Sequence, residues 1–332
     1  MVTIEMAIST PSETHISSGI PQAMNYPEQV SLVEVGPRDG LQNEPTALSV
    51  EQKCTLVNLL SDCGLPVIET GAFVSARWVP QMADSGKVFQ SIERRPGVRY
   101  SALTPNERGF DEAVDNGVSE VAIFVAVTEQ FSRKNLNASI QETLDRYEPV
   151  LKKARAINMP VRGYLSCVLG CPYEGPVTPK PVSLLTKKLL DGGCYEVSLG
   201  DTIGTGTAGS MSRLLDTLLN DGFNARQLAV HCHDTYGQAL ANILIALQYG
   251  VVTIDTSVTG LGGCPYAVGA TGNVATEEVV YLLNGLGIQH NVDLNKLLAA
   301  GEYISDLLPR ETASSTYKAL RSAAAPNQSK DH

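Results

Sequence analysis

Eight short apolar runs alternate along this chain of 332 residues with longer stretches of helical periodicity. The stretches 50–60 and 210–219, for example, repeat apolar residues three and four positions apart. Near-continuous apolar strands that alternate with helices predict a parallel sheet covered by helices. Eight such units fit an α/β fold, the (β/α)8 TIM barrel of about 250 residues, and a doubly wound open sheet is the alternative. The expected strands are 30–35, 66–73, 98–103, 120–127, 160–167, 195–199, 228–233 and 252–258.

The predicted barrel is flanked by two segments of different composition. Residues 1–28 are rich in Ser, Thr and Pro and contain no Lys or Arg, so we expect neither a secretory signal nor a mitochondrial presequence. We interpret them as a flexible N-terminal extension. Residues 29–311 are predicted to form the barrel domain with a C-terminal helical extension, and residues 312–332 a polar tail. No apolar run approaches the roughly 20 residues of a membrane span.

Composition limits the partners of the chain. A net charge of −10 and a pI near 5.0 argue against a nucleic-acid surface, which needs clustered Lys and Arg. A few local cations and helix N-termini can still hold an anionic small molecule. The seven cysteines are scattered and odd in number. They favour reduced thiols in a cytoplasmic protein over a disulfide framework.

Polar residues follow most of the predicted strands. A barrel of this kind collects its chemistry at the C-terminal ends of the strands. A single such residue is more often a cap or a turn residue, but agreement at six of the eight strand ends favours a shared site. These residues are Arg38 and Asp39 after the first strand, Glu69 in the second, Ser166 and Cys167 at the fifth, Asp201 at the sixth, His231 and His233 at the seventh, and the loop from Gly260 to Cys264 after the eighth.

The two histidines are the most specific of these residues. On a strand His231 and His233 share a face and Cys232 points the opposite way. Like-facing imidazoles at a strand end can form half of a metal site, although a hydrogen-bonded core histidine is the alternative. Asp39 can add a carboxylate oxygen and Asn273 an amide oxygen, unless Asn273 is only a turn residue. Mixed nitrogen and oxygen ligands without a thiolate favour Mg²⁺ or Mn²⁺, with three-ligand Zn²⁺ as the alternative.

Six segments in order along residues 29–310 give the chain a family resemblance. It resembles the 3-hydroxy-3-methylglutaryl-CoA lyases of the DRE-TIM metallolyase superfamily. The cysteine loop is the most specific of the segments, because related Claisen-condensing synthases share the metal ligands but lack this loop. The segments are VGPRDGLQNE at 35–44, FVSARWVPQM at 73–82, SCVLGCPY at 166–173, SLGDTIG at 198–204, HCHDTYGQALAN at 231–242 and GLGGCPYA at 260–267.

The resemblance implies a usually dimeric barrel that cleaves hydroxymethylglutaryl-CoA to acetoacetate and acetyl-CoA, as in leucine breakdown and ketone-body formation. A divalent cation lowers the pKa of the substrate's C3 hydroxyl group. Arg38 is suited to the negative charge that develops on the thioester oxygen, and it can also form an ion pair with Glu69 or Asp201. Asp201 and His231 are both candidates for the general base.

The resemblance also assigns roles to the cysteine loop and the substrate pocket. Cys264 would protonate the enolate carbon, on a loop made mobile by its glycines. The alternative is that Cys264 is an incidental small residue in a turn. Glu69 and Asp201 would orient the other groups or relay protons. The loop glycines are Gly260, Gly262, Gly263 and Gly269, and the implied substrate contacts are Arg38, Gln42, Tyr164 and Ser198.

Several departures from the family pattern keep other functions open. They raise a longer 3-hydroxy-3-alkylglutaryl-CoA as an alternative substrate for the same chemistry. A condensing synthase and a non-catalytic scaffold are weaker alternatives, because Cys264 and every proposed ligand are present. The departures are Pro45, Ala72, Val127, Thr128 and Thr259.

Overall fold

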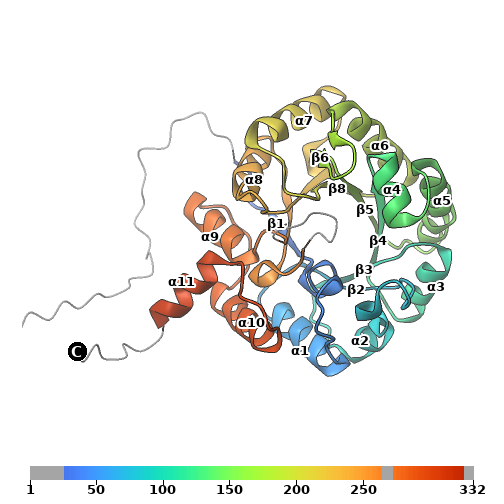
Figure 1. Cartoon of the computed structure of the whole chain (residues 1–332). Helices are drawn as coiled ribbons and strands as arrows, with labels where there is room; N and C mark the ends of the chain where they lie inside the picture. The colour runs from blue at the N-terminus through green and yellow to red at the C-terminus, as the bar shows by residue number, and fades with distance from the viewer. Residues whose placement is uncertain (1–25, 264–271, 325–332) are drawn as a thin grey trace, which may run out of the picture.

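A closed barrel of eight parallel strands forms the centre of the computed structural model, which describes residues 26–263 and 272–324 (Figure 1). The strands are hydrogen-bonded in the order β1-β10-β9-β8-β5-β4-β3-β2. The (β/α)8 prediction is confirmed, and the open-sheet alternative is wrong because β1 pairs with both β10 and β2. The strands are β1 (Ser31–Glu34), β2 (Val67–Ala72), β3 (Arg99–Leu103), β4 (Glu120–Ala126), β5 (Val161–Ser166), β8 (Glu196–Asp201), β9 (Leu228–Cys232) and β10 (Thr253–Thr256).

The helices form a ring around the barrel (Figure 1). Helix α1 begins with a capping box, in which Ser49 and Gln52 bind each other's backbone N–H groups and satisfy donors that a helix start leaves free. The same device begins α5 and α7. The ring contains α1 (Val50–Ser61), α2 (Ser85–Ser91), α3 (Glu107–Asp115), α4 (Glu129–Leu136), α5 (Ile140–Ala156), α6 (Pro179–Gly192), α7 (Ala208–Asn220), α8 (Ala239–Gln248) and α9 (Thr276–Leu286).

Short elements punctuate the loops between these units. A two-stranded hairpin follows β5, and the sequence patterns did not predict it. The short helices include a π-helical turn directly after β1 and a 3-10 turn after β10. These elements are β6 (Gly170–Cys171), β7 (Gly175–Pro176), η1 (Gly36–Gly40), η2 (Pro80–Met82), η3 (Ala225–Gln227) and η4 (Val258–Gly260).

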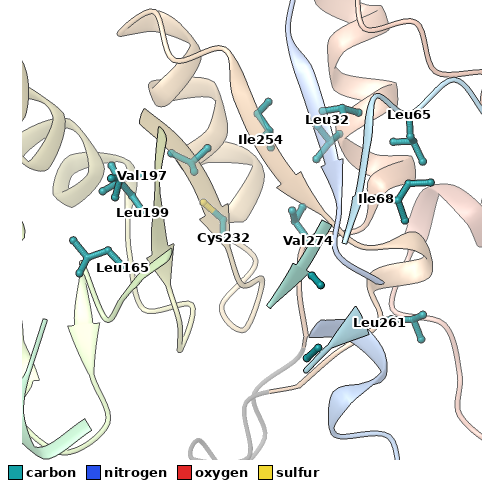
Figure 2. Close-up of a cluster of buried hydrophobic side chains, with 14 of the residues drawn as sticks. Leu32, Leu65, Ile68, Leu165, Val197, Leu199, Cys232, Ile254, Leu261 and Val274 are labelled. Atoms are coloured by element: carbon teal, nitrogen blue, oxygen red, sulfur yellow. The ribbon is translucent and has the colours of Figure 1, made fainter. Parts of the chain in front are cut away.

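The hydrophobic core lies between the barrel and the helices. Figure 2 shows part of this layer, in which Leu32, Ile68 and Ile254 come from three neighbouring strands. These side chains are at most 1% exposed, and burying each contributes roughly 1.5–3 kcal/mol. Cys232 belongs to the same core. The opposite orientation predicted for Cys232 relative to the two histidines is therefore confirmed.

Part of the barrel interior is charged, whereas branched apolar side chains usually fill the inside of such a barrel. Arg162 on β5 contacts Asp255 on β10, and these strands are not neighbours. Their contact must therefore cross the inside of the barrel. Strand alternation places the apolar neighbours of both residues on the outer face. Burial of the apolar side chains in the outer layer stabilises the barrel, so its inside can hold charged groups.

Packed structure continues beyond the predicted domain boundary at residue 311. After α10 (Leu294–Leu307), helix α11 (Ser315–Ala324) lies beside α9 and α10 (Figure 1). Ser314 donates a hydrogen bond to Glu278 on α9, and Tyr317 is 8% exposed. The predicted helical extension is thus confirmed. Residues 315–324 of the predicted polar tail form this packed helix, while residues 1–25 and 325–332 lie outside the described residues.

The described helices include none that is both long and apolar enough to cross a membrane.

If α11 is part of the domain, removing its buried side chain must weaken folding. We expect Tyr317→Ala to lower the free energy of unfolding by about 2–4 kcal/mol, as for other large-to-small changes in a core. Lys318→Ala, which changes an exposed neighbour on the same helix, is the control. Thermal unfolding should separate the two variants, and equal melting temperatures would show that α11 contributes nothing.

Candidate metal centre and active site

The site begins at the turn η1, which directly follows β1 and carries Arg38 and Asp39. The N–H of Gly36 donates to the buried carboxylate of Glu34 at 2.8 Å. A Cβ on Gly40 would lie 2.7 Å from the Cβ of Leu261, so a side chain does not fit there. π-helical turns often occur at functional sites. This close packing fixes the direction in which the two charged residues leave the barrel.

Asp39, His231 and His233 come together at the C-terminal ends of β1 and β9. One possible ligand atom from each lies within 4.8 Å of the others. His231 Nε2 is 3.9 Å from Asp39 Oδ2, and the two imidazole centroids are 5.3 Å apart. We call these three residues the triad, and their geometry is that of a possible metal site.

Asn273 lies beside the triad. Its backbone pairs with that of His233 in an isolated antiparallel bridge. Its Nδ2 donates to Asp39 Oδ2 at 2.9 Å and to the carbonyl of Leu261 at 3.1 Å. The residue is thus within reach of the site, while its role as a ligand stays a prediction.

The protonation states of Asp39 and His233 suit a cation. Burial alone would raise the pKa of Asp39, but Arg38 and the two histidines lower it to about 2. Burial, together with the charge of His231, lowers the pKa of His233 to about 4, so its imidazole is neutral at neutral pH. His233 Nδ1 is buried without a hydrogen-bond partner among the described residues. A carboxylate and neutral imidazoles are the forms that bind metals.

The charges around the triad also fit a divalent ion. The buried guanidinium groups of Arg38 and Arg162 each contact two carboxylates, and His231, which lies between Asp39 and Asp255, links the two groups into one cluster. With these six groups ionised and His231 neutral, the cluster has two negative charges in excess. A divalent cation would balance them in a region where unpaired charge is expensive. The carboxylates are Asp39, Glu69, Glu196 and Asp255.

Arg38 is held between two carboxylates. Its Nε donates to Glu69 Oε2 at 2.7 Å and its Nη1 to Asp39 Oδ1 at 2.8 Å. Burial opposes the charged form, but Glu69 and Asp39 hold the pKa of Arg38 above its usual value. The guanidinium also lies 5.5 Å from the ring centroid of Tyr164. The predicted ion pair with Glu69 is confirmed. Within the described part of the chain, Asp201 is not a partner of Arg38.

Asp201 ends β8 and is completely buried. Its Oδ2 accepts the N–H of Gly206 at 2.9 Å, whereas its Oδ1 has no hydrogen-bond partner among the residues described. Burial raises the pKa of Asp201 to about 6, against the lowering effect of backbone hydrogen bonds. A carboxyl group with such a pKa can exchange a proton near neutral pH.

His231 is already engaged through its other nitrogen. Its Nδ1 lies 3.2 Å from Asp255 Oδ2. Burial would lower the pKa of His231, but Asp255 and Asp39 raise it. Nε2 is the nitrogen that faces Asp39, and it is therefore the one available to a metal.

Three predicted substrate contacts have different surroundings. Gln42 is half-buried after η1. Tyr164 is 7% exposed, and its hydroxyl accepts from Arg162 Nη1 at 3.1 Å. The hydroxyl of Ser198 is fully buried and donates to Asp255 Oδ2 at 2.7 Å. Substrate binding by these residues stays a prediction, and for Ser198 the hydrogen bond argues for a supporting role.

The cysteine loop is only partly within the described residues. Gly260 and Gly262 have φ values of +67° and +115°, which favour glycine. A Cβ on Gly262 would also lie 2.7 Å from Asn273 Nδ2. Gly263 ends the described part of the loop, and the predicted Cys264 and Gly269 lie outside it.

Sequence reasoning missed the residues beneath the site. Asp255, Arg162 and Glu196 form a buried cluster inside the barrel. Their signal was a charged residue inside an otherwise apolar strand, as in the run VVTIDT that ends at Thr256. A charge that is buried on a strand needs a partner, so this pattern alone indicated an interior ion pair.

Comparisons with known proteins place this chain in a family. The family model described as HMGL-like matches residues 29–304. The mitochondrial hydroxymethylglutaryl-CoA lyase of Gallus gallus is 56% identical over 294 residues, which cover 89% of this chain and 98% of the relative. The cytoplasmic 3-hydroxy-3-methylglutaryl-CoA lyase of Mus musculus is 54% identical over 90% of this chain and 87% of its own length. A crystal structure of hydroxymethylglutaryl-CoA lyase from Pseudomonas aeruginosa is 54% identical with a TM-score of 0.88, covering 91% of this chain and 100% of that one.

This chain belongs to the HMGL-like family. The resemblance carried by the six sequence segments is thereby confirmed. The family is metal-dependent, which agrees with the triad at the strand ends.

The triad generates a direct test of metal binding. We expect His233→Ala to weaken the binding of Mn²⁺ at least tenfold, because one of few protein ligands is lost. Isothermal titration calorimetry measures the dissociation constant. His290→Ala is the matched control, since His290 lies between α9 and α10 and its ring contacts Asn284. Equal Mn²⁺ affinity in both variants would remove His233 from the metal site.

Proposed function

We propose that this chain is a hydroxymethylglutaryl-CoA lyase that cleaves 3-hydroxy-3-methylglutaryl-CoA to acetoacetate and acetyl-CoA with a divalent cation. The observation that carries the proposal is the triad beside the buried, charged Arg38, in a chain more than half identical to named lyases. Mg²⁺ or Mn²⁺ is the proposed ion, because the donor set contains no thiolate. Asn273 would join the triad through its amide oxygen.

The chemistry requires a base, an anion-stabilising group and an acid. When bound, a divalent cation acts as a Lewis acid toward the substrate's C3 hydroxyl group. Asp201 is the preferred base, because its pKa of about 6 and its unpartnered Oδ1 suit proton transfer. His231 is the weaker candidate, since Nδ1 contacts Asp255 and Nε2 is the proposed ligand atom.

Arg38 stabilises the negative charge that reaches the thioester oxygen when the C2–C3 bond breaks. Its Nη2 has no hydrogen-bond partner among the described residues, whereas Nε and Nη1 are held by Glu69 and Asp39. The two hydrogen bonds made by Nε and Nη1 therefore fix the direction in which Nη2 points. A preorganised charged donor of this kind costs no reorganisation during the reaction.

The enolate of acetyl-CoA must then receive a proton at carbon. We assign this step to Cys264, on the loop that starts at Gly260. Gln42 and Tyr164 remain proposed substrate contacts. Glu69 acts by orienting Arg38.

The cellular setting is a separate proposal. The relatives include mitochondrial and cytoplasmic lyases, and the six described cysteines are all free thiols. We propose a cytoplasmic homodimer that acts in leucine breakdown or ketone-body metabolism.

A cleavage assay tests this function. We expect hydroxymethylglutaryl-CoA to yield equal amounts of acetoacetate and acetyl-CoA, with activity abolished by EDTA and restored by Mg²⁺ or Mn²⁺. A ten-carbon 3-hydroxy-3-alkylglutaryl-CoA should react with a kcat/KM at least about 10-fold lower, a difference of about 1.4 kcal/mol. Full activity without metal would contradict the mechanism, and preference for the long substrate would contradict the assignment. Release of CoA from acetyl-CoA plus a 2-oxo acid would indicate a synthase.

The role of Arg38 can be separated from folding. We expect Arg38→Gln to lower kcat about 100- to 1,000-fold, since a donor to the developing anion is lost. Arg99→Gln is the control, because Arg99 pairs with Glu120 and lies outside the proposed site. If Arg38→Gln loses activity only in proportion to its fraction unfolded, as measured by circular dichroism, Arg38 is structural.

A further inference from the structure

The carboxylate of Asp255 is buried inside the barrel, where it links His231 of the triad to side chains on two other strands, β8 and β5. Asp255 Oδ2 contacts His231 Nδ1 at 3.2 Å and accepts a hydrogen bond from Ser198 Oγ at 2.7 Å. Its other oxygen, Oδ1, accepts from Arg162 Nη2 at 2.7 Å. Asp255 is 2% exposed, and Ser198 and Arg162 are at most 1% exposed. The carboxylate therefore has four elements of the barrel around it: its own strand β10, and β9, β8 and β5.

Arg162 is itself fixed on a second side. Its Nε donates to Glu196 at 2.7 Å, and its Nη1 donates to the hydroxyl of Tyr164. The guanidinium is planar and cannot turn without breaking these bonds. The fixed guanidinium of Arg162 therefore holds the Asp255 carboxylate in the plane in which both of its oxygens accept hydrogen bonds.

The result of this chain of contacts is a fixed orientation of one imidazole. With Nδ1 of His231 bound to Asp255, only Nε2 points to Asp39. A free histidine ring could rotate and offer either nitrogen. Ligand histidines are commonly fixed in this way by a carboxylate behind them, and the loss of that carboxylate typically weakens metal binding 10- to 100-fold.

We propose that Asp255 is a positioning residue of the metal centre, which acts through His231 and is itself oriented by Arg162 and Ser198. The proposal rests on the metal site proposed above. It gives the buried Ser198 a role without substrate contact. It also explains why the barrel keeps an arginine in its interior, where a charge is costly unless it is paired.

The first test is Asp255→Asn. The amide has the shape of the carboxylate but can accept hydrogen bonds through only one atom, whereas Asp255 accepts through both. We expect the dissociation constant of Mn²⁺, measured by isothermal titration calorimetry, to rise 10- to 100-fold. Thr256→Val is the matched control: it is the adjacent residue on β10, equally buried, and its hydroxyl has no partner among the described residues. Its Mn²⁺ affinity should stay at the wild-type value.

The second test uses Ser198→Ala, which removes a single neutral hydrogen bond and leaves the ion pair intact. We expect Mn²⁺ affinity to fall about fivefold, the equivalent of one such bond. In the Asp255→Asn background the same change should have little further effect, because Ser198 acts through Asp255. If Asp255→Asn does not fold, the comparison of Ser198→Ala with the control Thr256→Val tests the positioning role without it.

The outcomes separate this inference from the metal site itself. If the wild-type protein binds no Mn²⁺ stoichiometrically, the metal site is wrong. If the wild type binds Mn²⁺ and folded Asp255→Asn or Ser198→Ala binds it equally well, the metal site stands and the positioning role is wrong. A lower melting temperature with unchanged Mn²⁺ affinity likewise assigns Asp255 to folding alone.

Discussion

The ion pair between Arg162 and Asp255 supports both halves of the candidate site. It crosses the inside of the barrel from β5 to β10, at 2.7 Å and almost without exposure. Asp255 contacts His231 of the triad, and Arg162 contacts Tyr164, whose ring faces Arg38. Removing one partner of a buried pair typically costs about 3–5 kcal/mol, since the remaining charge has no compensation. The metal ligands and the proposed anion-stabilising group therefore share one buried support.

The barrel makes this arrangement possible because its stabilising apolar contacts and its charged groups lie on opposite faces of the sheet. Its outer face and the helices bury the apolar side chains, such as Leu32 and Ile254. Inward-facing positions of strands that are distant in sequence then meet inside the barrel. Arg162, Glu196 and Asp255 hold each other in place there, and Arg38 on η1 pairs with Asp39 and Glu69 at the C-terminal end of the strands. A divalent cation bound at the triad would balance their excess of negative charge.

Much of this could be predicted from residue patterns that are local. Each strand was visible as a short, largely apolar run, and the spacing of His231 and His233 placed both rings on one face. The partners of Arg162 and Asp255 could not be predicted, because they depend on which strands face each other after the barrel closes. Helix α11 was missed because one buried residue, Tyr317, anchors a segment that is otherwise polar. The position of Asn273 depends on a backbone bridge to His233, which no local pattern encodes.

The charged cluster around the triad has a charge and a geometry that one divalent cation would complete. The most direct measurement is the melting temperature of the metal-free wild-type protein as Mg²⁺ or Mn²⁺ is added, against NaCl at equal ionic strength. Binding to the folded state alone stabilises it by about 2.7 kcal/mol at 100 times the dissociation constant. We therefore expect the melting temperature to rise with divalent ion concentration by several degrees beyond the NaCl control. Identical melting temperatures in the two salts would contradict the account.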